Sequence, residues 1–150
     1  MPVSNRWETH QVAGDFHQLP LRITSVGMSY WPAKAMVQRE YCTLFGIELV
    51  TSGAMEFCQN RQRYCVEPGE VFLLRKSCAH YYRTAQEFVC KRYLTLEGTA
   101  LEPILQANDL IDTDYVQLTN PIHFTSLMRR VYQLLAQKPP EYHLLSSHFA

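Results

Sequence analysis

Hydrophobic and polar positions form a series of short runs between residues 21 and 96. These runs are rich in β-branched and aromatic residues, which favour strands, and turn residues separate them. In order they read LRITSVGMSYW, YCTLFGIELV, AMEFC, RYCV, EVFLLR, HYYR and FVCKRYLTL. Short strands at this spacing predict an all-β block that folds as a sandwich or a small barrel.

Three turn signals divide the block. Ser52 and Gly53 end one predicted strand, Gln59 and Asn60 are the expected tip of a hairpin, and residues 67–70 read Glu-Pro-Gly-Glu. Proline followed by glycine is the order that a type II turn prefers. Before the block, the first twenty residues show no clear period, so they predict an irregular arm.

The hydrophobic period changes to a helical one after Gly98. A capping box formed by Thr99 and Glu102 predicts a short helix that runs to about Ala107. Asn120 then has the chemistry of an N-cap before a first-turn proline, and apolar residues recur every three or four positions. They are Phe124, Leu127, Met128, Val131, Leu134 and Leu135. We expect this amphipathic helix to lie across the sheet, or else to share in a subunit interface.

The last residues predict one more helix. Pro139 and Pro140 end the amphipathic helix, and the segment EYHLLSSHFA has helical character without a C-cap signal before Ala150. The sequence is therefore expected to stop inside a helix. The whole pattern divides the chain into an arm at 1–20, a β barrel at 21–98 and a helical region at 99–150.

Composition and charge narrow the function. The 150 residues include 47% hydrophobic ones, which suits one globular domain, and 14 basic residues balance 14 acidic ones. Without a basic stripe, this chain alone is not expected to bind DNA. No apolar run approaches the roughly 18 residues of a membrane span, and the N-terminus lacks the features of a signal peptide. By elimination, a cytoplasmic location is expected.

The five cysteines are an odd number without a C-x-x-C pair. This pattern favours reduced thiols over disulfides or a zinc site. Most of them occupy positions where a strand would hold a small hydrophobic residue, so we expect them to fill the core.

The ordered segments FGIELVTSGAMEF, RYCVEPGEVFLLRKSCAHYYR and FVCKRYLTLEG resemble the N-terminal sensor domain of AraC-family transcription regulators. The resemblance implies an α+β, mainly β fold, in which helices follow a cupin-type barrel. That family shows a Pro-Gly-Asp/Glu turn, an aliphatic strand leading to a histidine and an aromatic residue, and a last strand running into Phe-Asp-Gly. Here Leu96-Glu97-Gly98 stands for that last element.

His80 raises the question of a metal. Metal-binding cupins use a His-x-His pair and a glutamate in their first motif, because one imidazole cannot hold a divalent ion. The corresponding region, from Gly46 to Phe57, holds Glu48 and Glu56 but no histidine. We therefore expect neither a metal nor another cofactor. His80 either reads a ligand or merely bonds a backbone carbonyl at a strand end.

Alternation along the last strand separates an apolar face from a mixed face. Leu94 and Leu96 belong to the apolar face, while Lys91 and Tyr93 belong to the mixed face. A sheet with helices on one side and a ligand cavity on the other shows this asymmetry. The alternative is that Lys91 and Tyr93 face solvent.

The resemblance implies where ligand contacts lie. They come from the mixed face of the last strand, from the strand before it, from an arginine ahead of the second long strand, and from the arm. Carried over to this sequence, the implied ligand-binding residues are Arg39, His80, Tyr82, Lys91 and Tyr93. In the arm, Trp7 and Phe16 are candidates on their chemistry alone.

The resemblance implies an effector-sensing and dimerisation domain that is not an enzyme. A small molecule would bind in a metal-free pocket, two copies would pair through their C-terminal helices, and DNA would be bound only by a further domain after Ala150. The effector could be a sugar or a small carboxylate, while Met28, Met36 and Met55 would equally suit an apolar ligand. The rival functions are a small cupin enzyme, such as an isomerase or dioxygenase, and a cupin binding protein without a DNA-binding partner.

Overall fold

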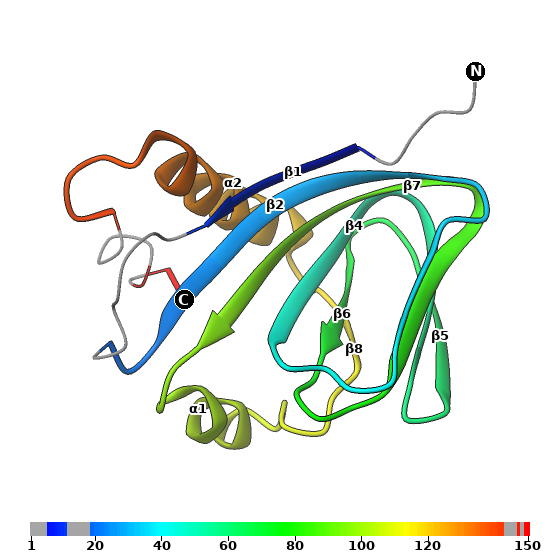
Figure 1. Cartoon of the computed structure of the whole chain (residues 1–150), viewed down its shortest axis with the longest axis horizontal. Helices are drawn as coiled ribbons and strands as arrows, with labels where there is room; N and C mark the ends of the chain where they lie inside the picture. The colour runs from blue at the N-terminus through cyan, green and yellow to red at the C-terminus, as the bar shows by residue number, and fades with distance from the viewer. Residues whose placement is uncertain (1–5, 12–18, 143–146, 148) are drawn as a thin grey trace.

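A computed structural model of the chain describes residues 6–11, 19–142, 147, 149 and 150. Within these residues, eight strands form one antiparallel sheet and two helices follow the long strands (Figure 1). The strands are β1 (Arg6–Gln11), β2 (Arg22–Pro32), β3 (Met36–Arg39), β4 (Phe45–Gln59), β5 (Gln62–Val66), β6 (Glu70–Leu74), β7 (His80–Glu97) and β8 (Tyr115–Gln117). The helices are α1 (Leu101–Ala107) and α2 (Pro121–Gln137).

The sheet is organised around its two longest strands, β4 and β7, which pair with each other along most of their length. β7 pairs first with β3 and then with β2, while β4 pairs with β6 and then with β5. Because each long strand changes its outer neighbour part-way, the sheet bends there. It curls into a barrel with open ends (Figure 1).

The bend in β4 lies where the sequence predicted a strand end, and that prediction was wrong. The pairing with β7 shifts register between Val50 and Ser52 and again between Gly53 and Met55. Gly53 has a φ of +74°, and a Cβ on it would lie 2.1 Å from the carbonyl oxygen of Phe88. A bulge at this glycine therefore turns the strand without ending it.

Other strand boundaries also differ from the prediction. The runs HYYR and FVCKRYLTL were expected as two strands, but β7 continues through the exposed residues 85–87 between them. The short strands β3 and β8 were not predicted, because four mostly exposed residues and a three-residue bridge carry no strong alternation. Residues 6–11, expected to be irregular, form β1 and pair with β2. A strand at the sheet edge needs only backbone hydrogen bonds, so it leaves little pattern in the sequence.

The two turns predicted between β4 and β6 are present, although the hairpin tip lies one residue later than the predicted Gln59 and Asn60. The β4–β5 hairpin turns at Asn60 and Arg61, both of which have positive φ, as a two-residue hairpin loop requires. In the turn at residues 67–70, the backbone N–H of Glu70 donates to the carbonyl of Glu67 at 3.0 Å.

Helix α2 begins and ends where its sequence signals lie. The side chain of Asn120 accepts a hydrogen bond from the N–H of His123 at 3.0 Å, and Pro121 is the first helical residue. At the other end, Lys138 adopts a left-handed conformation and donates its N–H to the carbonyl of Leu134. Pro139 and Pro140 follow, as predicted.

Helix α1 ends at Ala107 as expected, but its predicted capping box is absent. The N-cap is Ala100, which makes no side-chain cap. The N–H groups of Ala100 and Leu101 donate instead to the carbonyls of Pro20 and Gly98. These backbone bonds fix the start of the helix one residue later than predicted.

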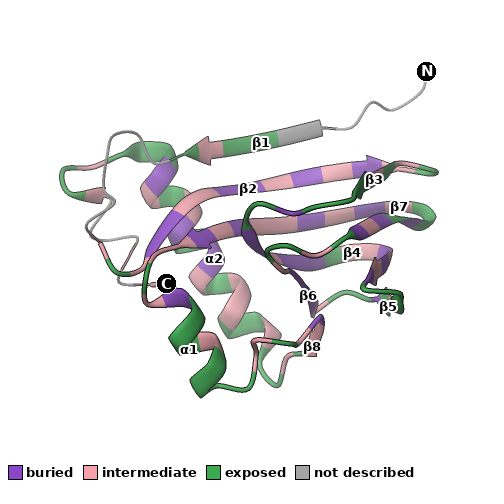
Figure 2. Cartoon of the chain, turned by 60° about the horizontal axis from the view of Figure 1, so that its bottom comes forward, coloured by how far each residue is buried: buried purple, intermediate pink, exposed green. Residues whose placement is uncertain are grey.

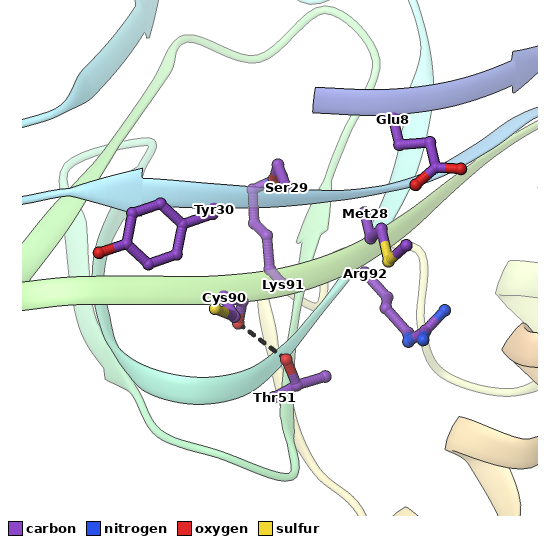
Figure 3. A pocket seen from close by; sticks show the side chains of 8 residues that line it. All are labelled: Glu8, Met28, Ser29, Tyr30, Thr51, Cys90, Lys91 and Arg92. Atoms are coloured by element: carbon purple, nitrogen blue, oxygen red, sulfur yellow. Dashed lines mark hydrogen bonds between the residues drawn. The ribbon is translucent and has the colours of Figure 1, made fainter. Parts of the chain in front are cut away.

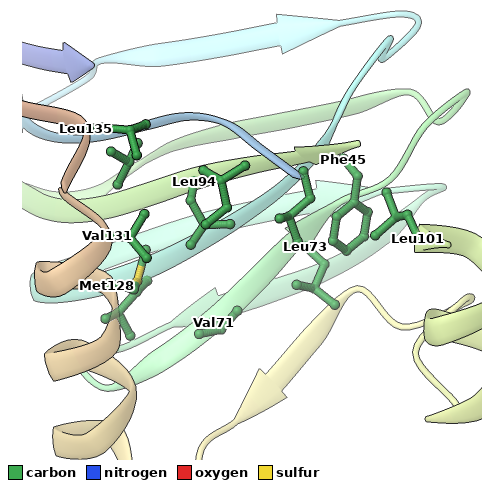
Figure 4. Close-up of a cluster of buried hydrophobic side chains, with 12 residues drawn as sticks. Phe45, Val71, Leu73, Leu94, Leu101, Met128, Val131 and Leu135 are labelled. Atoms are coloured by element: carbon green, nitrogen blue, oxygen red, sulfur yellow. The ribbon is translucent and has the colours of Figure 1, made fainter. Parts of the chain in front are cut away.

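Two hydrophobic cores lie on opposite faces of the sheet. The outer core joins the sheet to the helices through Leu94, Leu96, Met128, Val131 and Leu135 among others, so the predicted helix-covered apolar face is confirmed (Figure 4). The inner core fills the barrel with residues such as Trp31, Phe57, Phe72 and Tyr82. Buried positions alternate along much of β2 and β7, whereas residues 8–11 of β1 and most of α1 are exposed or partly exposed (Figure 2).

The cysteines do not all fill the core. Cys42 is buried, Cys65 is exposed and the other three are intermediate, so the predicted filler role holds for Cys42 alone. The further helix predicted after Pro140 falls largely on residues outside the described part of the chain. Among the residues described, neither helix is both long and apolar enough to cross a membrane.

Candidate functional site

Strand β7 carries four of the five predicted ligand-binding residues, and the fifth lies on its neighbour. His80 and Tyr82 each expose 3% of their surface, Lys91 exposes 1%, and Tyr93 is half-buried. Arg39, an exposed residue of β3, pairs directly with His80 in the β3–β7 register. The alternative that Lys91 faces solvent is therefore wrong.

The first group of these residues lies at the end of the barrel where β7 begins. Nη1 of Arg39 lies 3.1 Å from Nε2 of His80 and donates to the Tyr82 hydroxyl at 3.4 Å. The rings of His80 and Tyr82 stack with their centroids 5.9 Å apart. Three of the five predicted residues thus form one contact group.

The second group surrounds Lys91 inside the barrel. Its ammonium donates to Oε2 of Glu48 at 2.5 Å, and both side chains are buried. Three aromatic rings enclose the ammonium, with their centroids 4.8 to 5.5 Å from Nζ: Trp31, Tyr82 and Tyr93. Ring faces attract a cation, so the aromatic residues stabilise Lys91 together with Glu48. Tyr82 joins this group to the first one.

Burial sets the protonation of the site. It is the main cause that raises the pKa of Glu48, and the charge and hydrogen bond of Lys91 oppose it. Burial also raises the pKa of the Tyr82 phenol, so this group stays protonated at neutral pH. It lowers the pKa of His80 to about 4, with the positive charge of Arg39 adding to the effect. His80 is therefore neutral at pH 7.

Tyr93 connects the barrel interior to the arm. Its hydroxyl is hydrogen-bonded to the Thr9 hydroxyl on β1, although β2 lies between β7 and β1. The tyrosine crosses β2 over Gly27, where an added Cβ would lie 2.4 Å from the phenol oxygen. Glycine is required at this position because the side chain passes so close. Of the two arm candidates, Trp7 lies on β1 without a described side chain, and Phe16 falls outside the described residues.

The cavities lie around the barrel wall rather than within one shared pocket. One of about 360 Å³ has Lys91 in its lining, with Met28, Tyr30, Cys90 and Arg92 around it (Figure 3). A second, of about 280 Å³, is lined by Arg39 and His80 among others. The five predicted residues are thus close together, but they do not line one common cavity among those described. Their role in ligand binding stays a prediction.

Metal-ligating groups do not gather in the described part of the chain. Nowhere there do three His, Cys, Asp or Glu side chains come close enough to hold a metal ion. The polar groups of the site are instead a neutral imidazole, two cations, one carboxylate and tyrosine hydroxyls. Groups of this kind can form hydrogen bonds and charge pairs with a bound molecule.

Residues 40–150 match the family model described as AraC-like ligand binding domain. The chain belongs to this family. The match covers β4 to the C-terminus and begins directly after Arg39, so the AraC-like domain includes four of the five predicted residues. With the curled antiparallel sheet and the helices after it, the match confirms the predicted fold class: α+β, mainly β, with a cupin-type barrel.

Solved structures resemble the AraC-like domain at low sequence identity. The protein YhaK from Escherichia coli has a TM-score of 0.52 at 13% identity, over 62% of this chain and 45% of YhaK. The cupin domain of Cnp3 from Schizosaccharomyces pombe has a TM-score of 0.49 at 14% identity, over 71% and 76% of the two chains. A cupin superfamily protein from Desulfitobacterium hafniense has a TM-score of 0.48 at 14% identity, over 64% and 82%.

At such identities the likeness concerns the fold alone. This chain spans less than half the length of YhaK. The comparison with curated proteins gave no match.

Sequence reasoning missed the role of Glu48. It considered this glutamate only as a metal ligand, whereas the structure places it against Lys91. A single charged residue within the apolar run FGIELV was the available signal, because a buried charge needs a partner. Trp31 and Gly27 were also missed, since their roles depend on which strands lie side by side.

Proposed function

We propose that this AraC-like domain senses a small-molecule effector for a transcription regulator. The family match over residues 40–150 is the observation that carries this proposal. The buried polar group around Tyr82 supports it, because concave sites in binding domains combine apolar walls with a few placed polar groups. The effector acts on DNA only through a separate helix-turn-helix domain of the regulator, and the protein works in the cytoplasm.

Contacts of β1 suggest how effector binding changes the domain. Thr9 contacts Tyr93 from the barrel, while Glu8 and His10 contact Tyr132 of α2. The ring of Tyr132 meets that of His10 edge-on, with the centroids 4.9 Å apart. An effector that binds one arrangement of β1 better than another shifts the population toward it. The arrangement of α2 shifts with it, because β1 touches both.

We also propose that two copies of the domain pair through their C-terminal helices. The apolar face of α2 already packs on the sheet through Met128, Val131 and Leu135, so the subunit contact uses the outer face of α2 and the residues after it. Sedimentation of the domain with and without residues 139–150 tests this. We expect the shorter chain to be monomeric where the longer one dimerises, and equal dimer constants would refute it.

Two experiments test the regulatory function. A thermal-shift screen with sugars and small carboxylates, followed by calorimetry, should find a compound that binds and is recovered unchanged. Turnover of the compound would show an enzyme instead. The gene sequence after codon 150 tests the DNA-binding part, which requires a helix-turn-helix segment in the same reading frame.

A further inference from the structure

The cavity of about 360 Å³ against β1, β2, β4 and β7 lies on the outer face of the sheet, and we call it the outer cavity. Ser29 and Lys91 border it, but their side chains lie in the barrel, where Ser29 accepts from Trp31 and Lys91 pairs with Glu48. Successive residues of a strand point to opposite faces, so Lys91 and Arg92 leave β7 on opposite sides (Figure 3). The sheet therefore separates the outer cavity from the barrel interior.

Cross-strand pairing builds an apolar wall in the outer cavity. Tyr30 pairs with Cys90, and Met28 pairs with Arg92 in the next row, so these side chains share one face. Burial raises the pKa of the Cys90 thiol, which therefore stays neutral and belongs to the apolar wall with Met28 and Tyr30. Methionine and cysteine sulfurs are polarisable and adapt to the shape of what they contact. With a volume in the range of small-molecule sites, the outer cavity suits a compact apolar group.

The end of the outer cavity beside α2 carries net positive charge. Arg92 is partly buried, lies over the ring of Tyr132 at 5.9 Å, and forms no ion pair within the described residues. Burial lowers the pKa of Arg92, and the charge of nearby Arg129 adds to the effect. Among the described lining residues Glu8 supplies the only carboxylate, and this carboxylate accepts a hydrogen bond from the Tyr132 hydroxyl. Two guanidinium groups thus face one carboxylate.

We propose that the outer cavity binds a carboxylic acid with a small apolar or aromatic body. The carboxylate pairs with Arg92, whose planar fork can donate two parallel hydrogen bonds, and the body lies against Met28, Tyr30 and Cys90. A sugar is disfavoured there, because its hydroxyls would lie unpaired against the apolar wall. The site is outside the barrel, so its ligand is distinct from the effector of the proposed function, and both can be bound together.

Calorimetry of the protein with phenylacetate, phenylacetamide and acetate, at matched ionic strength, tests the chemical class. Phenylacetamide has the body of phenylacetate without its charge, and acetate has the charge without the ring. We expect phenylacetate to bind the wild-type protein. Each of the other two compounds should bind roughly tenfold more weakly or worse, because it lacks either the charged hydrogen bonds or the buried ring.

Three variants test the charged end of the outer cavity. Arg92→Gln should weaken phenylacetate roughly tenfold or more. Glu8→Gln keeps an acceptor for Tyr132 but removes the carboxylate that repels the ligand, so it should tighten phenylacetate a few-fold. Glu8 is exposed on an edge strand, so this variant should stay folded even if Arg92→Gln does not. Arg83→Gln is the matched control, because Arg83 also lies on β7 but outside the cavity, and it should leave the affinity unchanged.

Thiol labelling locates the bound acid. Cys90 lines the outer cavity, whereas Cys65 is exposed on β5 and does not line it. Saturating phenylacetate should slow the alkylation of Cys90 by N-ethylmaleimide several-fold and leave that of Cys65 unchanged. Mass spectrometry of the labelled peptides measures both rates.

The inference is overturned if phenylacetate does not bind at high millimolar concentration, or if it binds while Cys90 is labelled as fast as in the free protein. Self-association that depends on Arg92, without binding of the acid, would make the outer cavity a contact between copies and would also overturn it. Neither result decides the proposed function. That function depends on an effector inside the barrel and on a helix-turn-helix segment in the gene.

Discussion

Lys91 and Glu48 form a buried ion pair inside the barrel. Removing two charges from water costs several kcal/mol for each ion, and the pair is stable only because each charge meets the other at 2.5 Å. Three aromatic rings exclude water and attract the ammonium. A substitution that removes one partner leaves the other charge buried and uncompensated.

Lys91→Met should lower the free energy of unfolding by about 3–5 kcal/mol, the usual cost of breaking a buried ion pair. The double variant Lys91→Met with Glu48→Leu should recover much of that loss, because no charge then remains unpaired. Urea denaturation measures both. Arg83→Met is the control: Arg83 pairs with Glu56 on the exposed outer surface, and its loss should change little. If Lys91→Met behaved like the control, the interior pair would not be buried as described.

His80 should make stability depend on pH. Its pKa in the folded domain is about 4, against 6.5 for an ordinary histidine. Between these values the unfolded chain binds a proton on His80 and the folded chain does not, so stability falls as the pH drops from 6.5 to 4. The contribution of His80 to the free energy of unfolding should be about 2–3 kcal/mol smaller at pH 4.5 than at pH 7.

The variant His80→Gln isolates this effect, because glutamine does not titrate. Urea unfolding of both proteins at pH 4.5 and at pH 7 measures how much the free energy of unfolding of each protein changes with pH. Other groups, including Glu48 with its raised pKa, contribute equally to both proteins and cancel. Parallel pH dependences for the two proteins would mean that His80 is solvated and that its pKa is ordinary.

At the scale of elements, the sequence predicted most accurately the elements whose hydrophobic pattern repeats over many residues. The period of α2, its N-cap at Asn120 and its end before Pro139 agreed with the structure, because these signals are local. The bend at Gly53 was read as a strand end, since a glycine after a serine looks the same in a turn and in a bulge. Only the pairing of β4 with β7 distinguishes the two, and at the bend it joins Ser52 to Cys90 and Gly53 to Val89, which are far apart in the sequence.

Strand β1 depends on one glycine of its neighbour. A Cβ at Gly27 would lie 2.3 Å from the carbonyl oxygen of Glu8 and 2.4 Å from the hydroxyl of Tyr93. Gly27→Ala should therefore separate β1 from β2 and break the contact between Tyr93 and Thr9. We expect faster amide exchange at residues 8–11 by mass spectrometry, while β4 keeps its protection.

Gly46→Ala is the matched control for that experiment. Its added Cβ would meet Leu74 at 3.3 Å, and this leucine side chain can adjust. Exchange at β1 should be unchanged in this variant. Equal exchange at β1 in Gly27→Ala and in the wild type would show that Tyr93 does not pass over β2.

At the scale of the whole molecule, alternation predicted that His80 shares a face with Tyr82 and that Lys91 shares one with Tyr93, and only the family resemblance placed both pairs in one site. Alternation could not predict that Lys91 meets Glu48. The two are diagonal neighbours in the register, in which Glu48 lies opposite Tyr93 and Val50 opposite Lys91. The cavity at the barrel end depends on how β3 and the β4–β5 hairpin come together. No local sequence pattern indicates that arrangement.

The charge distribution of the whole barrel predicts that the domain folds without a metal. Metal-binding cupins place histidines in their first motif, whereas residues 46–57 here contain none, and the interior holds the Lys91 ammonium with Arg39 close enough to act on Glu48. These two cations oppose a divalent ion there. A strong chelator should therefore leave the melting temperature unchanged, and elemental analysis should find no stoichiometric metal. A structural zinc ion contributes on the order of 10–16 kcal/mol of binding free energy to the folded state, so its removal would lower the melting temperature by many degrees. Such a drop, reversed when one particular metal is added back, would contradict the prediction and bring the enzymatic cupins back as the nearest functional analogy.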